Sequence, residues 1–113
     1  MKIIEQKISI EELKELTKKM YGNLVKADVD IAKGLLIVDM AMHADGEKYL
    51  LDSGSNQGDL WGINIYPDKE GENMIEFDSM INIRPNEGNM SRYVDDEKIR
   101  KQIFDLVLSK IEK

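Results

Sequence analysis

The chain of 113 residues contains no cysteine, a single histidine and only two prolines. The absence of cysteine excludes a disulfide scaffold, a thiol nucleophile and a zinc site built from thiolates. One histidine excludes a histidine-rich zinc site. Pro67 and Pro85 are too few to form a proline-rich linker. The longest apolar run, Gly34 to Val38, is far shorter than the roughly 20 residues of a membrane-spanning helix.

Positive charge is also scarce, because 16 Lys and Arg face 22 Asp and Glu, for a formal net charge of -6. This balance argues against nucleic acid and membrane partners, since nonspecific binding to either needs cationic attraction. No charged segment is followed by a long apolar stretch, so no signal peptide is visible and we expect a cytoplasmic protein. The length predicts a single domain over residues 1–113, and a hydrophobic share of 42% is enough for a core.

The first half of the chain predicts a helix followed by a hairpin. Ser9 reads as an N-cap with Glu12 completing a capping box, and the helix should end at Gly22. Apolar and polar residues alternate from Leu24 to Ile31, which is typical of a half-buried strand. A tight turn should join it to a more continuously apolar strand from Leu35 to Met42.

The second half predicts a short helix over 43–51, strands over 60–66 and 74–84, and a last helix capped by Asp95 or Asp96. Residues 2–8 add a possible short edge strand. The order is therefore (β)αββαββα, which indicates an α+β fold. We expect one four- or five-stranded sheet, mostly antiparallel or mixed, with the helices mainly on one face.

Polar residues gather on one face of the predicted second hairpin. If Tyr66 pairs with Met74, then Asn64 opposes Glu76, and the alternation of side chains creates one shared polar face. That face would carry Asn64, Asp78, Asn82 and Arg84. It is either a ligand-binding surface on rigid elements or an ordinary solvent-exposed sheet face with polar cross-strand pairs.

The segment from residue 84 to residue 100 contains all three arginines, Arg84, Arg92 and Arg100. Arginine offers a planar fork that matches carboxylate and phosphate oxygens. Neutral hydrogen-bond donors lie around Arg84 and Arg92 in the sequence. We therefore predict an anion site formed by Asn82, Arg84, Asn86, Asn89, Ser91 and Arg92. The alternative is that arginine pairs and asparagine turns stabilise a long loop.

His43 lies where an apolar strand gives way to an acidic turn. Beside Asp45 or Asp78 it would form a general acid/base pair, as in a hydrolase. The alternative is a structural histidine with satisfied ring nitrogens. The chain has neither a phosphate-binding loop nor a dinucleotide fingerprint. We therefore expect no cofactor and no resident metal.

Two stretches and one tripeptide mark a family resemblance. They are the run DLWGINIYP ending at Pro67, the run EFDSMINIRPNEGN ending at Asn89, and His43-Ala-Asp45. They resemble a family of small prokaryotic proteins of about 110 residues that is catalogued only as a domain of unknown function. The resemblance implies an intact prokaryotic domain, and it implies no reaction.

Three functions remain open at this point. The first is a cytoplasmic binding module for a small anionic ligand, with Asn64 and Asp78 as orienting groups for the anion site. The second is an acid/base enzyme that uses His43. The third is a homodimeric interaction module that pairs through an uncovered sheet edge, for example the strand from Leu24 to Ile31. We rank binding over catalysis.

Overall fold

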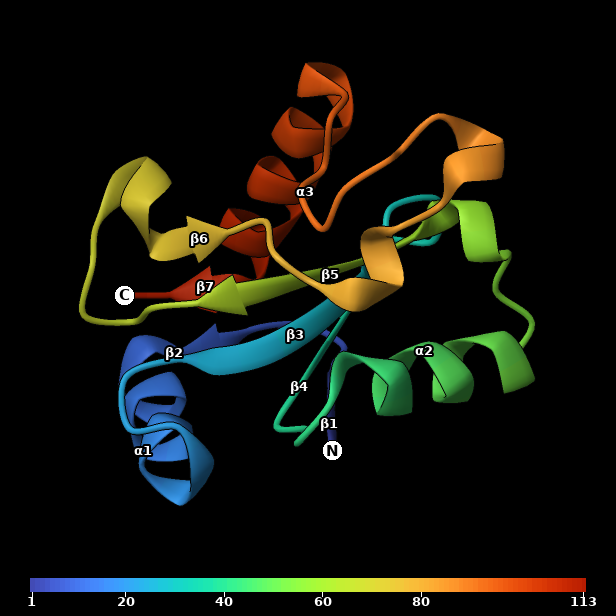
Figure 1. The fold of residues 1–113 in the computed structure, drawn as a ribbon. Helices are drawn as coiled ribbons and strands as arrows, with labels where there is room; N and C mark the ends of the chain where they lie inside the picture. Colours follow the sequence, from blue (N-terminus) through green and yellow to red (C-terminus); the bar gives the residue numbers. More distant parts are fainter.

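The chain forms a five-stranded sheet with three α-helices, and the computed structural model describes residues 1–113 (Figure 1). The elements of the main sheet are β1 (Lys2–Ile4), β3 (Val25–Asp30), β4 (Leu35–Val38), β5 (Leu60–Ile65) and β6 (Ile75–Glu76). The helices are α1 (Ile10–Met20), α2 (His43–Asp52) and α3 (Glu97–Lys110). The strands β2 (Ile8–Ser9) and β7 (Ile111–Glu112) form a separate parallel pair. The predicted α+β class is confirmed.

Both terminal helices begin where the sequence predicts. The Ser9 hydroxyl accepts a hydrogen bond from the backbone N–H of Glu12 at 3.1 Å and caps α1. The Asp96 carboxylate accepts one from the backbone N–H of Lys98 at 2.8 Å and caps α3. Gly22 takes a positive φ of 84° just beyond α1, as expected for the residue that ends that helix.

The strand β3 is the centre of the sheet, whose order is β1-β4-β3-β5-β6. It pairs antiparallel with β4, which confirms the first hairpin, and also with β5 along its whole length. The expectation that residues 24–31 offer an uncovered edge is therefore wrong. The free edges of the sheet belong to β1 and β6.

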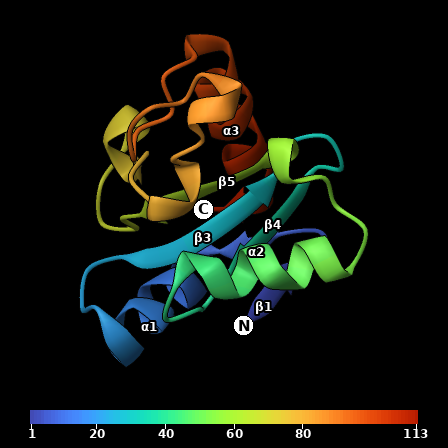
Figure 2. The same ribbon diagram turned by 45° about the vertical axis from the view of Figure 1, so that its right-hand side comes forward.

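The helices cover both faces of the sheet. One face packs against α1 and α3 over 17 buried apolar residues, which include Trp61. The other face packs against α2 over four buried residues, Ile37, Met40, Leu50 and Leu60. Figure 2 shows α2 lying across β3, away from α3. The two terminal helices thus share one face as expected, while α2 closes the opposite one.

The predicted strand over 74–84 is wrong beyond Glu76. The predicted register is correct at its start, since Asn64 is opposite Glu76 and the backbone N–H of Tyr66 donates to the Met74 carbonyl at 2.7 Å. Farther along, the chain crosses over Gly62 so closely that a methyl group there would lie 2.6 Å from Ser79 Cβ. A regular strand cannot pass at that distance, because the Cβ atoms of directly opposite residues in an antiparallel pair lie ≈ 4.5–5.5 Å apart.

A side chain replaces the missing strand at the edge of β5. The Gly62 N–H donates to Asn82 Oδ1 at 2.9 Å, and Asn82 Nδ2 donates to the Gly62 carbonyl at 3.0 Å. This amide makes the two hydrogen bonds that a paired residue would make. The Arg84 guanidinium caps the next carbonyl, that of Leu60. Asn82 and Arg84 are therefore parts of the sheet edge.

No α-helix of the structure has both the length and the apolar character needed to cross a bilayer.

Candidate functional site

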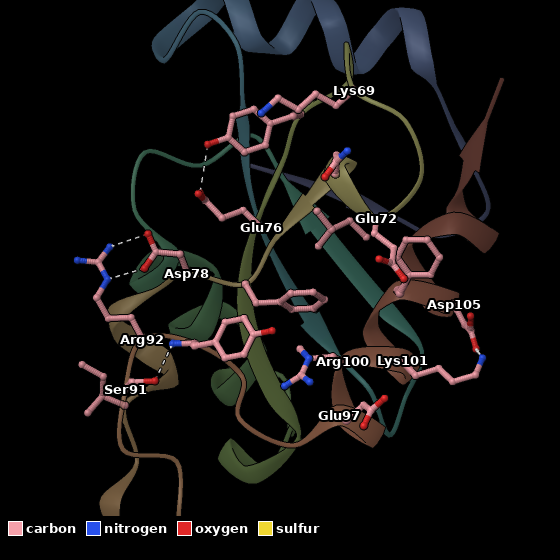
Figure 3. A pocket seen from close by; sticks show the side chains of 17 residues that line it. Lys69, Glu72, Glu76, Asp78, Ser91, Arg92, Glu97, Arg100, Lys101 and Asp105 are labelled. Carbon is pink, nitrogen blue, oxygen red and sulfur yellow. Dashed lines mark hydrogen bonds and ion pairs between the residues drawn. The ribbon is translucent and has the colours of Figure 1, made fainter.

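A groove of about 1410 Å³ lies between β6, the segment from residue 91 to residue 93, and α3 (Figure 3). Four aromatic side chains line it, and so do charged side chains of both signs. It follows the outer edge of β6, where no further strand is paired. A second concave surface, beside Trp61 and Asn89, measures only about 390 Å³, so the groove is the more natural place for a ligand.

Aromatic rings form the centre of the groove. The rings of Phe77 and Tyr93 meet edge to face, with centroids 6.2 Å apart and planes at 87°. The Arg100 guanidinium carbon lies 4.9 Å from the centroid of the Tyr93 ring. Tyr93 is 47% exposed, so a large aromatic surface faces the open groove.

The predicted residues Asp78, Ser91 and Arg92 lie on the rim of this groove. Arg92 Nε donates to Asp78 Oδ1 at 2.7 Å, and Ser91 Oγ donates to Asp95 Oδ1 at 3.3 Å. Figure 3 shows the Arg92 guanidinium turned toward Asp78. The Arg92 guanidinium, which was expected to bind an anion, is thus paired with a carboxylate of the chain itself.

A second polar group lies at the Tyr66 end of the groove. Asn64 Nδ2 donates to Glu76 Oε1 at 2.8 Å, and the Tyr66 hydroxyl donates to the same oxygen at 3.2 Å. Burial, and then the negative charge of Glu76, raise the pKa of Tyr66 above its usual value. The Asn64 Oδ1 atom is buried and has no hydrogen-bond partner. This end of the groove carries negative charge with no cation in a salt bridge to it.

The remaining residues of the predicted anion site do not face the groove. Asn89 Nδ2 donates to the carbonyls of Asn82 and Tyr93 at 2.7 and 2.6 Å, so its amide holds the loop together. The Arg84 guanidinium stacks 4.3 Å from the centroid of the Trp61 ring, and burial lowers its pKa. Asn86 lies exposed in a short 3₁₀ turn over Pro85–Glu87. The predicted set is therefore split between the core, the surface and the groove rim.

His43 stands apart from both of its predicted partners. Its Nε2 atom lies 2.7 Å from the Ile63 carbonyl, and the ring is buried at the start of α2. No hydrogen bond joins it to Asp45 or Asp78. Burial lowers the pKa of His43, so the ring is neutral at pH 7. The structure does not assemble the acid/base pair, and no three acidic or histidine side chains converge as metal ligands would.

One comparison with known proteins identifies the family. A family model described as "Protein of unknown function (DUF5674)" matches residues 2–110. The chain belongs to the DUF5674 family. The match spans nearly the whole chain and confirms the resemblance to a domain of unknown function. No curated protein and no solved structure matches the chain, so DUF5674 brings no reaction or ligand with it.

The burial of two acidic residues of this DUF5674 chain, Asp28 and Asp30, was not predicted from the sequence. The alternation along β3 placed Asp28 and Asp30 on a solvated face, yet both are fully buried because α2 covers that face. Asp30 Oδ1 accepts from the backbone N–H groups of Ala32 and Lys33, both at 2.9 Å, and Oδ2 accepts from Ser55 Oγ at 2.6 Å. An aspartate directly before a turn is the signal for such bonds. Asp28 has no comparable partners.

Proposed function

We propose that the protein is a binding module for an extended peptide segment, which lies in the groove along β6. The observation that carries the proposal is the free backbone edge at Phe77. Because β6 is the last strand of the sheet, a further strand could pair with the free backbone groups of Phe77. The N–H groups of Ile75 and Ser79 on either side already donate to the carbonyls of Glu72 and Arg92. A strand added there would continue the order β1-β4-β3-β5-β6 by one.

The backbone of Phe77 supports this mode of binding. Tyr66 donates to the carbonyl of Met74, and hydrogen-bonding direction alternates along an antiparallel strand. Glu76 therefore points its backbone groups toward β5, and Phe77 points its own outward. Neither the N–H nor the carbonyl of Phe77 makes a hydrogen bond within the chain. An incoming residue opposite Phe77 would form both bonds.

The size of the groove favours an extended ligand. Pockets for small molecules typically measure about 300–1,000 Å³, whereas this groove measures about 1410 Å³ and is open. Exposed aromatic residues such as Tyr93 are the side chains that contribute most to protein interfaces. A peptide would place an apolar side chain beside Ile75 and Phe77, on the face that α3 covers.

The charges that line the groove favour a peptide with Lys or Arg as the ligand, rather than a small anion. Arg92 is paired with Asp78, and Lys101 with Asp105. Arg100 donates to the carbonyls of Val94 and Asp95. The groove carboxylates of Glu72, Glu76 and Glu97 have no salt bridge, against a single groove cation without one, Lys69, whose ammonium lies 4.5 Å from the centroid of the Tyr66 ring. The anionic ligand expected from the sequence would therefore compete with pairs that already exist.

An alternating peptide of valine and lysine, six residues long with acetylated and amidated ends, tests the proposal. We expect it to shift the amide NMR signals of residues 75–77, 91–93 and 97–105. Tyr93→Ala should weaken binding by about tenfold or more, since a hot-spot aromatic contributes more than ~1.4 kcal/mol. The matched control is Tyr49→Ala, because Tyr49 on α2 is similarly exposed and lies outside the groove.

Two further peptides separate the competing interpretations. Methylating alternate backbone nitrogens of the same peptide should abolish binding, because strand addition needs those donors. A peptide of alternating valine and glutamate should bind more weakly than the lysine peptide. Stronger binding of the glutamate peptide would instead support an anion site at Ser91 and Arg92. Equal binding by the Tyr93→Ala protein would refute the groove as the site.

The cytoplasmic location belongs to the same proposal. It is supported by the absence of cysteine from the sequence.

A further inference from the structure

Asp28 is a carboxyl group with no partner in the interior of the protein. Its side chain is fully buried on the face of β3 that α2 covers. Neither carboxyl oxygen makes a hydrogen bond of good geometry, and the nearby backbone N–H of Glu47 stabilises the charge only in part. Its neighbours across the sheet are Ile37 on β4 and Gly62 on β5, and neither has a side chain that can donate. A charge in such a place is costly, because its hydration is not fully replaced.

The helix above Asp28 packs tightly against one of its carboxyl oxygens. A methyl group built on Gly46 would collide with Asp28 Oδ2 and would lie 2.9 Å from the sulfur of Met40. The backbone of α2 at Gly46 thus rests directly on this oxygen. A space that cannot hold a methyl group cannot hold a hydrating water molecule. On this side Asp28 Oδ2 can be hydrated only if α2 moves.

The charged groups around Asp28 also oppose its ionisation. Burial raises its pKa to about 8, and the negative charges of Glu47 and Asp45 on α2 act in the same direction. The backbone N–H of Glu47 and the Lys26 ammonium on β3 offset part of this effect. Glu47 itself has a buried carboxylate oxygen, Oε2, without a hydrogen-bond partner. Ionised Asp28 would therefore face a second unneutralised carboxylate.

The attachments of α2 to the rest of the protein are few. Its apolar contact is the cluster of four buried residues, against 17 on the other face of the sheet. The contact of His43 Nε2 with the Ile63 carbonyl is its one side-chain hydrogen bond to the sheet. The ion pair of Lys48 with Asp52 lies within the helix. Such a segment opens locally at a lower free energy than the core does.

Positive φ angles flank the helix on both sides. Asp39, between β4 and α2, has a φ of 64°, and Gly54, just after α2, has a φ of 101°. A non-glycine residue at positive φ is an uncommon, strained conformation. The connections on either side of α2 are therefore the natural points at which the helix would swing.

We propose that the protonation state of Asp28 controls the position of α2. The helix lies on the sheet while the Asp28 carboxyl group is protonated, and it lifts when that group ionises. Lifting exposes Leu50 and the small apolar cluster beneath the helix. It also lets water reach Asp28 and Glu47. The surface that α2 presents to other molecules thus changes with pH.

The sign and size of the pH dependence follow from the difference in proton binding between the closed and the open state of α2. When α2 opens, Asp28 regains water and its ordinary pKa of 3.8, while the closed state keeps the raised pKa of about 8. Between these values the closed state binds one proton more, so the opening constant rises about tenfold per pH unit. His43 acts oppositely, because its pKa is lowered in the closed state. Above pH 6.5 the open-state ring of His43 is less than half protonated, so its opposing effect on the opening constant is at most about twofold and the effect of Asp28 dominates.

Amide hydrogen exchange read by NMR between pH 6.5 and 7.5 tests the proposal. After correction for the intrinsic exchange rate, protection of α2 amides should fall about tenfold over this interval in the wild-type protein. Protection of buried α3 amides such as those near Ile103 should stay higher than that of α2 amides at every pH, because α2 opens at a lower free energy than the core does. In Asp28→Asn the fall should vanish, since the amide has the same shape and does not ionise. Asp45→Asn, an exposed acid on the same helix, is the matched control and should keep the fall.

A measurement without any variant completes the test. The ¹³C signal of the Asp28 carboxyl group should show a proton at pH 6 and titrate near pH 8 in step with α2 protection. Titration of Asp28 near its ordinary pKa would overturn the proposal. An equal loss of protection in Asp28→Asn and wild type would also overturn it. If Asp28→Asn does not fold, the coincidence of carboxyl titration and α2 exchange decides the question.

Discussion

The Asn82 amide should be one of the most costly polar side chains to remove from this protein. In Asn82→Ala the N–H and the carbonyl of Gly62 both lose their partner, while the carbonyl of Arg92, to which Asn82 donates at 2.9 Å, keeps its bond from the Ser79 N–H. Asn82 is fully buried, so water does not replace these bonds. Each buried group left unsatisfied costs about 1–3 kcal/mol. We expect the free energy of unfolding to fall by roughly 3–5 kcal/mol, since two such groups belong to Gly62.

Urea denaturation followed by the fluorescence of Trp61, the single tryptophan, measures this loss. The matched control is Asn86→Ala, because Asn86 is exposed and makes no hydrogen bond; its change should stay within about 0.5 kcal/mol. Asn82→Asp keeps an acceptor for the Gly62 N–H but places a carboxylate against two carbonyls, and it should destabilise at least as much as alanine. A loss below ~1 kcal/mol for Asn82→Ala would refute the idea that this amide closes the sheet edge.

Three other substitutions probe the interior. Gly46→Ala forces a methyl group onto Asp28 and Met40, and overpacking of this kind should cost about 1–3 kcal/mol in thermal denaturation. Arg84→Lys loses the planar stack on Trp61 and should lower stability by about 1–3 kcal/mol, with a changed Trp61 emission spectrum. His43→Gln removes a ring whose pKa is lowered by folding, so wild type should lose stability relative to the variant as pH falls below 6.5. A difference between the two that is independent of pH from 7 to 5 would contradict the burial of a neutral ring.

Local signals predicted the elements that depend on neighbours in sequence. Ser9 and Asp96 cap helices because their side chains reach N–H groups two or three residues ahead. The strand β5 and its register with Glu76 follow from alternation and turn length. The strand predicted over 74–84 fails because Asn82 bonds to Gly62, 20 residues away, and such a contact leaves no periodic trace.

The same limit explains the predicted site. Asparagine and arginine donors look alike in sequence whether they await a ligand or are bonded to carbonyls of the chain, as those of Asn89 and Arg84 are. The burial of Asp28 depends on a helix that packs from the opposite face, so alternation along β3 places it in solvent. Arg92 and Ser91 do reach the groove rim, because short exposed loops leave their side chains free to point outward.

The parallel pairing of β2 with β7 has a consequence for the order of folding during synthesis. Ile8 pairs with Ile111, 103 positions later in the chain, by subtraction of the two residue numbers. A ribosome that releases the chain from its first residue must expose β7 before this pair can form. The sheet from β1 to β6 is complete earlier and α1 already packs on it, but the part of that face beneath α3 stays uncovered until residues 97–110 are released. Apolar surface there is therefore open to a chaperone until α3 has emerged.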